Sequence, residues 1–581
     1  MLARSNNKTY PKLTREELIQ QFNNIVGTKR VLTKLTQTAY YRSGFRSGNG
    51  AALAVVFPNT ILEQWKLIEV CVKANCIIIM QAAKTGLTEG SSPSGDEYDR
   101  NVVIINTLAI NQIHLINNGK QAISLSGASL YSLEEKLTEV NRAPHSVIGS
   151  SQIGATVVGG IANNSGGALV KRGPAYTEFA LYAQVDKDGK LHLVNHLGID
   201  GLGKTSEEIL HNVQEGNFDP INIQHGTGMA SDHEYVDRVR NVESDIPARY
   251  NADSRRLFEA SGCAGKLGVF AVRTDTYAVP DKEQVFYLGT NNAKKLTKLR
   301  KDILTNFKNL PEMAEYLHRT IFKITEGYGK DTFLSINYLG TKNIPKFFAV
   351  KAKVENLLKR LPLLSDSLPD KFLFYLSKLF PQHLPKRMLE FGDRYEYHLI
   401  LKMSNKGITE AQDYLEKYWS KEYDSDFFVC TDDEGDKALL HRFAAGAAAG
   451  RYQIIHSNEV EGILSLDIAL RRNDDDWVEK LPQEINDNLV HVLYYGHFMC
   501  NVFHQNYIFK KGTDRQKMKS TMLAILDDKG AKYPAEHNVG HLYEAENSLQ
   551  RFYKKLDPTN TFNPGIGKMS KYQGHCSCCH S

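Results

Sequence analysis

The stretch GSSQIGATVVGGIANNSGG, residues 149–167, decides the fold of this chain. Glycine, serine, alanine and asparagine dominate it, and side chains this small cannot stabilise a core by apolar burial. Two further stretches, QAAKTGLTEGS (residues 81–91) and SGCAGKLGV (residues 261–269), have the same character. Small residues let consecutive backbone N–H groups converge on an anion, as a pyrophosphate requires. The three stretches predict a groove in which a flat cofactor lies against the backbone; close strand–helix packing and an ordinary surface loop are the alternatives.

Short apolar runs surround the first of these loops. The runs AVVF (residues 54–57), CIIIM (76–80) and VVII (102–105) are typical of buried strands, and a helix opened by Pro58 is predicted between the first two. This β-α-β order indicates an α/β domain. The G-x-G-x-x-G fingerprint of Rossmann domains is absent from all three glycine-rich loops.

Length and composition limit the class of protein. A chain of 581 residues with 42% hydrophobic and 24% charged residues predicts two or more globular domains and excludes a disordered or collagen-like chain. Its net charge of +5 is too small to indicate a nucleic-acid binder. The first twelve residues contain no apolar signal segment and no spanning helix is evident, so the chain is expected to be neither secreted nor transmembrane. Three of the eight cysteines crowd into the last six residues, unlike a disulfide framework, which favours a reducing compartment.

Residues 286–520 differ from the rest, with fewer glycines and many Phe and Tyr, and are expected to form a separate domain. Within them, residues 342–387 carry ten Lys and Arg against three Asp and Glu, a local charge of +7, with Leu and Phe interleaved. Cations beside bulky apolar groups suit a lipid interface. We therefore expect a membrane-docking segment; a solvated charged face is the alternative, and the apolar content disfavours a nucleic-acid contact.

The three loops, in this order and spacing, resemble the FAD-binding domain of the vanillyl-alcohol oxidase or p-cresol methylhydroxylase (PCMH) type. Bacterial quinone-dependent D-lactate dehydrogenases are similar to the chain over nearly its whole length, in particular at YRSGFR (residues 41–46), PHSVIGSS (144–151), KRGPAYTE (171–178) and PAEHNVGH (534–541).

The resemblance implies an α/β (α+β) fold in two parts. Residues 1–285, completed by residues 521–581, would form a PCMH-type FAD-binding domain. Residues 286–520 would form an antiparallel-sheet cap with helices, carrying the basic amphipathic membrane-docking segment at residues 340–390.

The resemblance also implies non-covalent FAD. The residues expected at its pyrophosphate are Ala82, Ala83, Lys84, Thr85, Gly86, Gly90 and Ser91, and those expected elsewhere along it are Gly149, Thr156, Gly166 and Val269. Lys84 departs from the Asn expected in relatives, so it could add a cation near the phosphates or point to solvent. The implied reaction is oxidation of D-lactate to pyruvate by hydride transfer to FAD. The electrons would then pass to a membrane quinone.

The resemblance further implies a peripheral protein on the cytoplasmic face of a bacterial inner membrane. Its expected partner there is an anionic phospholipid surface, and no nucleic acid is expected. A larger D-2-hydroxy acid is the alternative substrate, because one extra methylene changes discrimination by only about 1–3 kcal/mol.

Two segments offer groups for the chemistry. The run GHFMCNVFH (residues 496–504) has two imidazoles, and Glu536 and His537 follow about thirty residues later. In related FAD-dependent D-2-hydroxy-acid dehydrogenases a similar pattern implies that His497, His504 and Glu536 hold a divalent ion and that His537 is the base. In an unbroken strand the two histidines would face apart, so convergence requires an irregularity near Gly496 or Asn501. Hydrogen-bonded core histidines are the alternative.

Arg442, before an Ala/Gly-rich helix, occupies the position at which relatives bind the substrate carboxylate, and a guanidinium suits such bidentate binding. Arg451 is the second candidate for this role. A surface arginine on a helix is the alternative for each.

A competing motif, GIDGLGKT (residues 198–205), matches the G-x-x-x-x-G-K-[ST] phosphate loop, and LAILD (523–527) imitates the acidic strand of a nucleotide hydrolase. The preceding run, residues 191–196, alternates with polar residues as a half-exposed hairpin strand does, whereas a phosphate-loop strand is buried on both faces. Thr205 is predicted to cap a helix whose first-turn acids would repel phosphate. The hydrolase hypothesis is therefore disfavoured.

Overall fold

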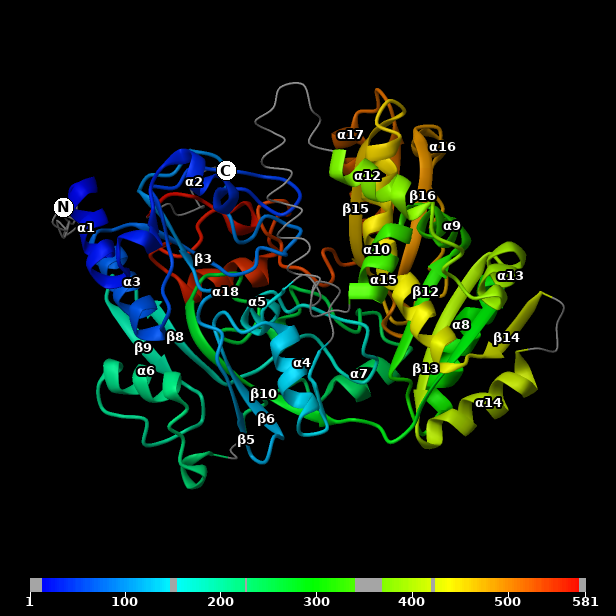
Figure 1. Ribbon diagram of the computed structural model, residues 1–581, viewed down its shortest axis with the longest axis horizontal. Coiled ribbons are helices and arrows are strands. Elements are labelled where there is room, and N and C mark those ends of the chain that lie inside the picture. The colour runs from blue at the N-terminus through cyan, green and yellow to red at the C-terminus, as the bar shows by residue number, and fades with distance from the viewer. Residues whose placement is uncertain (1–12, 147–153, 225–226, 340–367, 420–423, 574–581) are drawn as a thin grey trace, which may run out of the picture.

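The computed structural model describes residues 13–146, 154–224, 227–339, 368–419 and 424–573 (Figure 1). Gly149 and residues 340–367 of the expected membrane segment lie outside the described residues. Three sheets form two parts that lie side by side in Figure 1, with the first two sheets in one part and the third in the other. The mixed α/β class is confirmed.

The first sheet contains the predicted β-α-β unit. Strands β2 (Ala54–Val56) and β3 (Ile77–Gln81) run parallel to β4 (Val102–Asn106), which lies between them. The connecting helix α3 (Ile61–Lys73) begins three residues after Pro58, because the side chain of its N-cap Thr60 accepts a hydrogen bond from the backbone N–H of Glu63. A short antiparallel strand, β1 (Val31–Leu32), completes the sheet in the order β1-β2-β4-β3.

The second sheet is antiparallel throughout, in the order β5-β6-β10-β8-β9 with β7 also paired to β10. Its strands are β5 (Ile113–Ile116), β6 (Gln121–Leu125), β7 (Arg142–Pro144), β8 (Ala180–Val185), β9 (Leu191–Asn195) and β10 (Gly268–Ala278). The other helices before β11 are α1 (Arg15–Val26), α2 (Leu35–Arg42), α4 (Leu130–Thr138), α5 (Val157–Ala162), α6 (Ser206–Glu215) and α7 (Tyr235–Arg240). One hydrophobic core joins the two sheets, and it includes Ile78 and Ile105 of the first sheet and Leu181 and Phe270 of the second.

The third sheet has seven antiparallel strands in the order β14-β11-β13-β12-β16-β17-β15, which confirms the antiparallel sheet expected in the second part. They are β11 (Glu283–Thr290), β12 (Met313–His318), β13 (Tyr397–Ser404), β14 (Ser425–Val429), β15 (Val460–Ala469), β16 (Leu489–His497) and β17 (Val502–Lys510). The described helices that accompany them are α8 (Ala293–Asn306), α9 (Arg319–Tyr328), α10 (Lys330–Leu339), α12 (Leu368–Ser377), α13 (Lys386–Arg394), α14 (Lys406–Tyr418), α15 (Asp432–Ile455), α16 (Gln483–Asn486) and α17 (Arg515–Asp528).

Successive residues of the third sheet enter different cores, as the alternation of side chains along a strand requires. In β11, Phe286 and Leu288 pack with α8, α14 and α17, whereas Val285 and Tyr287 pack with α9, α13 and α15. Helices therefore cover both faces of this sheet.

The residues after α17, which are 529–573 in the described part of the chain, pass back to the first part, and we call them the C-terminal return. The boundary expected at residue 521 falls inside α17, whose buried Met518 and Met522 belong to the core of the third sheet. Beyond it, the chain crosses to the first part, where the carbonyl oxygen of Leu556 at the end of α18 (Asn547–Leu556) accepts a hydrogen bond from Gln184 of β8 at 2.8 Å. Ile78 of β3 exchanges backbone hydrogen bonds with Thr561 and Asn563 at 2.9 Å each. The C-terminal return thus extends the edge of the first sheet.

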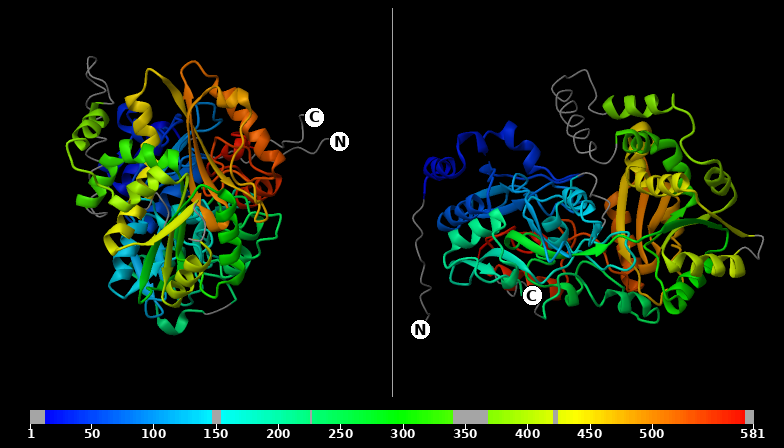
Figure 2. Two further views of the ribbon diagram at one scale, coloured as in Figure 1. Left: turned by 90° about the vertical axis from the view of Figure 1, so that its right-hand side faces the viewer. Right: turned by 60° about the horizontal axis from the view of Figure 1, so that its bottom comes forward.

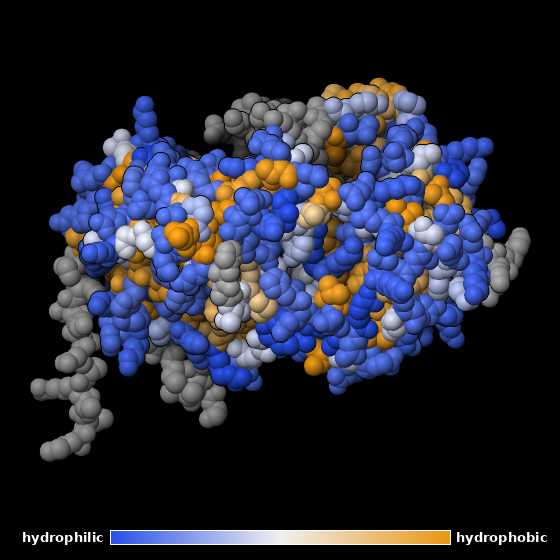
Figure 3. All heavy atoms as spheres, turned by 90° about the horizontal axis from the view of Figure 1, so that it is seen from below, coloured by the Kyte–Doolittle hydropathy of each residue, from blue (hydrophilic) through white to orange (hydrophobic). Residues whose placement is uncertain are grey.

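The described part of the basic segment, together with Tyr338 just before it, exposes large apolar side chains. They lie on α10, on α12 and on the turn after α12, and we call them the α12 surface: Tyr338, Leu368, Phe372, Tyr375, Leu376, Leu379 and Phe380. Green helices from this region project at the top of the right-hand view of Figure 2, and hydrophobic side chains gather at the upper edge of Figure 3. Within the described residues, every helix is too short or too polar to span a bilayer.

Candidate functional site

The glycine-rich stretches meet in the first part, where two asparagines of the C-terminal return tie them together. Asn563 donates from Nδ2 to the carbonyl oxygens of Gly90, at 2.7 Å, and Ala264, at 2.9 Å, so it bridges the first and third stretches. Asn538 donates to the side chain of Asn163 in the second stretch. Backbone hydrogen bonds join the second and third stretches directly. The structure therefore brings together the loops from which the sequence predicted one groove.

The first loop has free donors for an anion. It follows β3 at the carboxyl end of the parallel strands, and none of the backbone N–H groups of residues 82–91 donates to another described residue. A Cβ added at Gly86 would meet no atom within 4 Å, so the space beside this glycine is open. An open loop of unpaired N–H groups fits a pyrophosphate, and residues 82–86, Gly90 and Ser91 lie in it as expected.

Lys84 does not point to solvent. Its ammonium group is turned back into the protein, where it donates to the carbonyl oxygens of Tyr40 and of Ser43, at 2.7 Å for Ser43. It also lies 3.9 Å from the centre of the Tyr40 ring. Burial lowers the pKa of Lys84 to about 8. Lys84 therefore fastens the loop to the segment after α2 instead of pointing to solvent.

The other expected cofactor residues line the same region. Thr156 caps α5 and accepts a hydrogen bond from the N–H of Gly159 at 3.1 Å. Val269 is the second residue of β10, next to a β-bulge, and is packed in one core with Val157 of α5. A Cβ added at Gly166 would lie 2.1 Å from Oε1 of Glu536, so only glycine lets the loop approach this carboxylate.

His497, His504 and Glu536 converge as the sequence predicted, and the required irregularity is a hairpin. β16 ends at His497, a short turn of residues 498–500 follows, Asn501 adopts a left-handed conformation with φ of 54°, and β17 starts at Val502. His497 lies opposite Val502 and His504 opposite Tyr495, so the two imidazoles are diagonal neighbours on one face.

The geometry of this group suits a metal ion. One ligand atom from each of the three residues lies within 4.8 Å of the others. The Nε2 atoms of the histidines are 3.4 Å apart, and Oε2 of Glu536 is 3.3 Å from that of His497 and 3.8 Å from that of His504. Two imidazoles and one carboxylate form a donor set used by divalent ions in catalytic sites. These residues could hold an ion and leave positions open for substrate.

Two buried carboxylates stand behind the histidines. Glu315 accepts a hydrogen bond from Nδ1 of His497 at 2.7 Å, and Asp467 Oδ1 lies 3.2 Å from Nδ1 of His504. Burial opposes the charged imidazole of His497, but the carboxylates of Glu315 and Glu536 outweigh this and raise its pKa to about 10. Burial opposes the charged form of Glu536 too, yet His497 and Arg249 lower its pKa. The cluster is thus a network of compensating charges.

Arg442 reaches the same cluster, although its local structure differs from the expectation. It lies in the middle of α15, not before a helix, because a capping box at Thr431 starts the helix at Asp432. Its Nη2 lies 2.8 Å from Oε2 of Glu315, and its buried Nε has no partner among the described residues. Arg451 does not join the cluster, since its guanidinium pairs with the carboxylates of two other helices.

His537 lies at the partly exposed edge of the cluster. Its Nε2 is 3.8 Å from Oδ2 of Asp467, and its side chain is 29% exposed. The backbone oxygen of His537 accepts a hydrogen bond from the side chain of Asn251. Neighbouring Glu536 is buried, so the two adjacent residues face different environments as predicted, although residues 533–537 form bends and not an extended strand.

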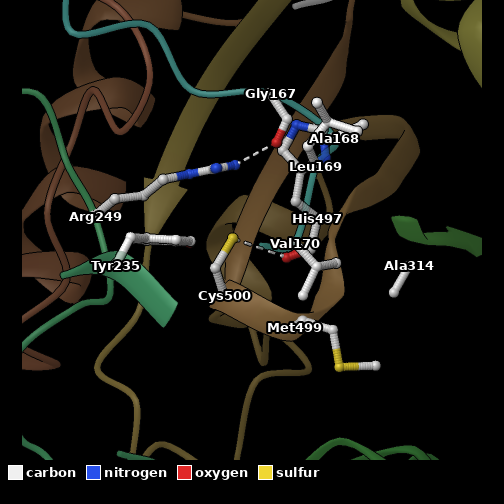
Figure 4. A pocket seen from close by; sticks show the side chains of 10 residues that line it. All are labelled: Gly167, Ala168, Leu169, Val170, Tyr235, Arg249, Ala314, His497, Met499 and Cys500. Atoms are coloured by element: carbon white, nitrogen blue, oxygen red, sulfur yellow. Dashed lines mark hydrogen bonds between the residues drawn. The ribbon is translucent and has the colours of Figure 1, made fainter. Parts of the chain in front are cut away.

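Arg249, which sequence reasoning missed, holds Glu536 from the side opposite the histidines. Its Nη2 donates to Oε1 of Glu536 at 2.5 Å and to the carbonyl oxygen of Gly167 at 2.6 Å. Figure 4 shows Arg249 directed at Gly167 across a small cavity of about 10 Å³ that Tyr235 and Cys500 also line. A cavity of this size has room for about one water molecule.

Glu315 and Asp467 were also missed, although each lies between two apolar neighbours in its strand, MAEYLH for β12 and VEGILSLDIA for β15. A charged residue in a buried strand is costly unless it is paired, and this was the available signal.

The phosphate-loop match lies outside this site and is a helix cap. The Glu208 carboxylate accepts hydrogen bonds from the backbone N–H groups of Lys204, at 2.7 Å, and Thr205, at 3.1 Å, which a phosphate would need. The run imitating an acidic strand, residues 523–527, lies in helix α17. The strand before the loop is β9, half-exposed and antiparallel to β8 as predicted.

Comparisons with known proteins agree with this geometry. Residues 52–195 match the family model described as "FAD binding domain", and residues 285–575 match "D-lactate dehydrogenase, membrane binding". The chain is 56% identical over 553 residues to the quinone-dependent D-lactate dehydrogenase of Escherichia coli, covering 95% of this chain and 96% of that one. It is 53% identical to that of Haemophilus influenzae, covering 96% and 98%.

Solved structures support the fold. An alkyldihydroxyacetonephosphate synthase aligns with a TM-score of 0.57 and 14% identity, covering 97% of this chain and 87% of that one. A substrate-bound p-cresol methylhydroxylase aligns with a TM-score of 0.56 and 12% identity, covering 96% and 97%. The PCMH-type fold, the open N–H loop and the residue cluster are consistent with the 56% and 53% identity to the two D-lactate dehydrogenases. The chain belongs to the quinone-dependent D-lactate dehydrogenase family.

Proposed function

We propose that this protein oxidises D-lactate to pyruvate and delivers the electrons to a membrane quinone. The observation that carries the proposal is the convergence of an imidazole pair, three carboxylates and Arg442 beside Gly166 of a cofactor loop. The three loops would hold FAD, which would supply the acceptor for the hydride from C2 of D-lactate. We assign residues 1–285 and the C-terminal return to the FAD-binding domain and residues 286–520, extended by α17, to the cap.

Arg442 binds the substrate carboxylate in this proposal. Glu315 holds one end of the guanidinium, while the unpartnered Nε leaves a donor for a second carboxylate. The ring of Tyr495 lies 4.6 Å below the guanidinium carbon and limits its movement. A fixed, partly satisfied arginine suits an anionic substrate of small size.

His537 takes the hydroxyl proton while the C2–H bond breaks, which leaves the carbonyl of pyruvate. Its partial exposure provides a route for that proton to solvent, and Asp467 keeps the ring at the edge of the cluster. His497, His504 and Glu536 would hold a divalent ion, which would supply an electrophile for the hydroxyl oxygen.

The α12 surface docks on the membrane that contains the quinone. Lys378 lies 5.6 Å from the ring centre of Tyr375, so cationic and aromatic groups share this surface. Such a surface suits anionic phospholipid. We place the protein as a peripheral protein on the cytoplasmic face of a bacterial inner membrane.

Anaerobic mixing with a panel of D-2-hydroxy acids tests the proposed reaction. D-lactate should bleach the flavin absorbance faster than larger acids, and removal of divalent ions should slow the bleaching. Arg442→Lys should raise the KM for D-lactate, because an ammonium cannot replace the guanidinium fork. Faster bleaching by a larger acid would favour the alternative substrate, and an unchanged KM would remove Arg442 from the carboxylate site.

A further inference from the structure

Asp467 contacts several residues of the candidate site, and its contact with His537 is only one of them. It lies on β15 directly opposite His504 on β17, so both side chains face the same side of the sheet. Its Oδ1 is 3.2 Å from Nδ1 of His504. With Nδ1 turned toward this carboxylate at ion-pair distance, the ring presents Nε2 to His497 and Glu536.

The second oxygen of Asp467 serves the next segment of the site. Oδ2 accepts a hydrogen bond from the backbone N–H of Glu536 at 2.7 Å and lies 3.8 Å from Nε2 of His537. One carboxylate, only 8% exposed, thus touches an expected metal ligand, the backbone of another and the proposed base.

Glu315 repeats this arrangement on the other side of the cluster. It lies on β12 opposite His497 of β16 and is 3% exposed. Oε1 accepts from Nδ1 of His497 at 2.7 Å, and Oε2 lies 2.8 Å from the guanidinium of Arg442. Each carboxylate therefore lies within 3.8 Å of one imidazole of the expected metal site and of one residue expected to face the substrate.

Such outer carboxylates fix the orientation of metal-bound imidazoles, and their loss commonly weakens metal binding about 10–100-fold. We propose that Asp467 and Glu315 are positioning residues that divide the site: Asp467 sets His504 together with His537, and Glu315 sets His497 together with Arg442. The inference rests on the proposed function, since it assigns the ion and the substrate as above. It adds that the two halves have different kinetic signatures.

The test compares Asp467→Asn with Glu315→Gln in the full-length flavoprotein. Both variants should bind Mn²⁺ about 10–100-fold more weakly in a calorimetric titration, because one imidazole loses its orientation in each. Asp467→Asn should lower kcat with little change in KM, since the base is displaced while Arg442 stays in place. Glu315→Gln should mainly raise the KM for D-lactate, since the arginine is loosened while the base stays in place.

The matched control is Asp476→Asn, which removes an exposed carboxylate whose one ion-pair partner in the described part of the chain is Lys480, and which should leave all three quantities unchanged. FAD content and thermal unfolding of each variant show whether the fold is intact. Unaltered Mn²⁺ affinity in both variants, or the same kcat and KM pattern in both, would overturn the inference. If the unaltered protein binds no Mn²⁺, the metal site of the proposed function fails, and the kcat and KM split still decides whether the carboxylates position His537 and Arg442.

Discussion

Membrane docking through the α12 surface can be tested with the double variant Phe372→Ala/Leu379→Ala. Phe372 is 65% exposed and Leu379 is 82% exposed. Complete transfer of such a side chain into an apolar medium is worth about 1.5–3 kcal/mol, so each exposed part contributes about 1–2 kcal/mol. The pair should contribute about 3 kcal/mol, which corresponds to a loss of binding of roughly 100-fold.

The assay is co-sedimentation with lipid vesicles, prepared with and without anionic lipid. Turnover of D-lactate with a water-soluble electron acceptor should stay unchanged, because neither side chain belongs to the candidate site. Ile221→Ala is the matched control, since this residue is 86% exposed in a short helix of the first part. Undiminished vesicle binding by the double variant, or an equal loss in the Ile221 variant, would refute the assignment of this surface.

Two further predictions concern the interior. Burial lowers the pKa of His441 to about 3, so below its ordinary pKa of about 6.5 the unfolded chain binds more protons than the folded one, and stability falls with falling pH. Between pH 7 and pH 5, the unfolding free energy should therefore fall by about 2 kcal/mol less in His441→Phe than in the unaltered protein, as measured by urea titration. An equal fall in both proteins would contradict the buried neutral imidazole. Gly166→Ala should displace Glu536, which its Cβ would meet at 2.1 Å, and reduce bound metal measured by mass spectrometry. Gly446→Ala, where the added Cβ meets nothing within 4 Å, is its control and should retain the metal.

Much of the fold follows from local sequence. The β-α-β unit could be predicted because buried parallel strands are continuous apolar runs, and β3 and β4 carry this pattern without interruption. The cofactor loops could be predicted because only small residues allow backbone donors to converge. The start of α15 at Asp432 was missed, although Thr431 and Glu434 form a capping box that the sequence displays.

The sequence by itself determined which chemical groups were available: glycine-rich loops, two histidines seven residues apart, and an acidic residue beside a third histidine. Whether these groups meet depended on tertiary structure, because the hairpin between β16 and β17 turns His497 and His504 onto one face. Lys84 gave no local sign of its carbonyl partners more than forty residues away. Asp467 and Glu315 were likewise hidden, because strand register decides which side chains face each other, and register links residues distant in the chain.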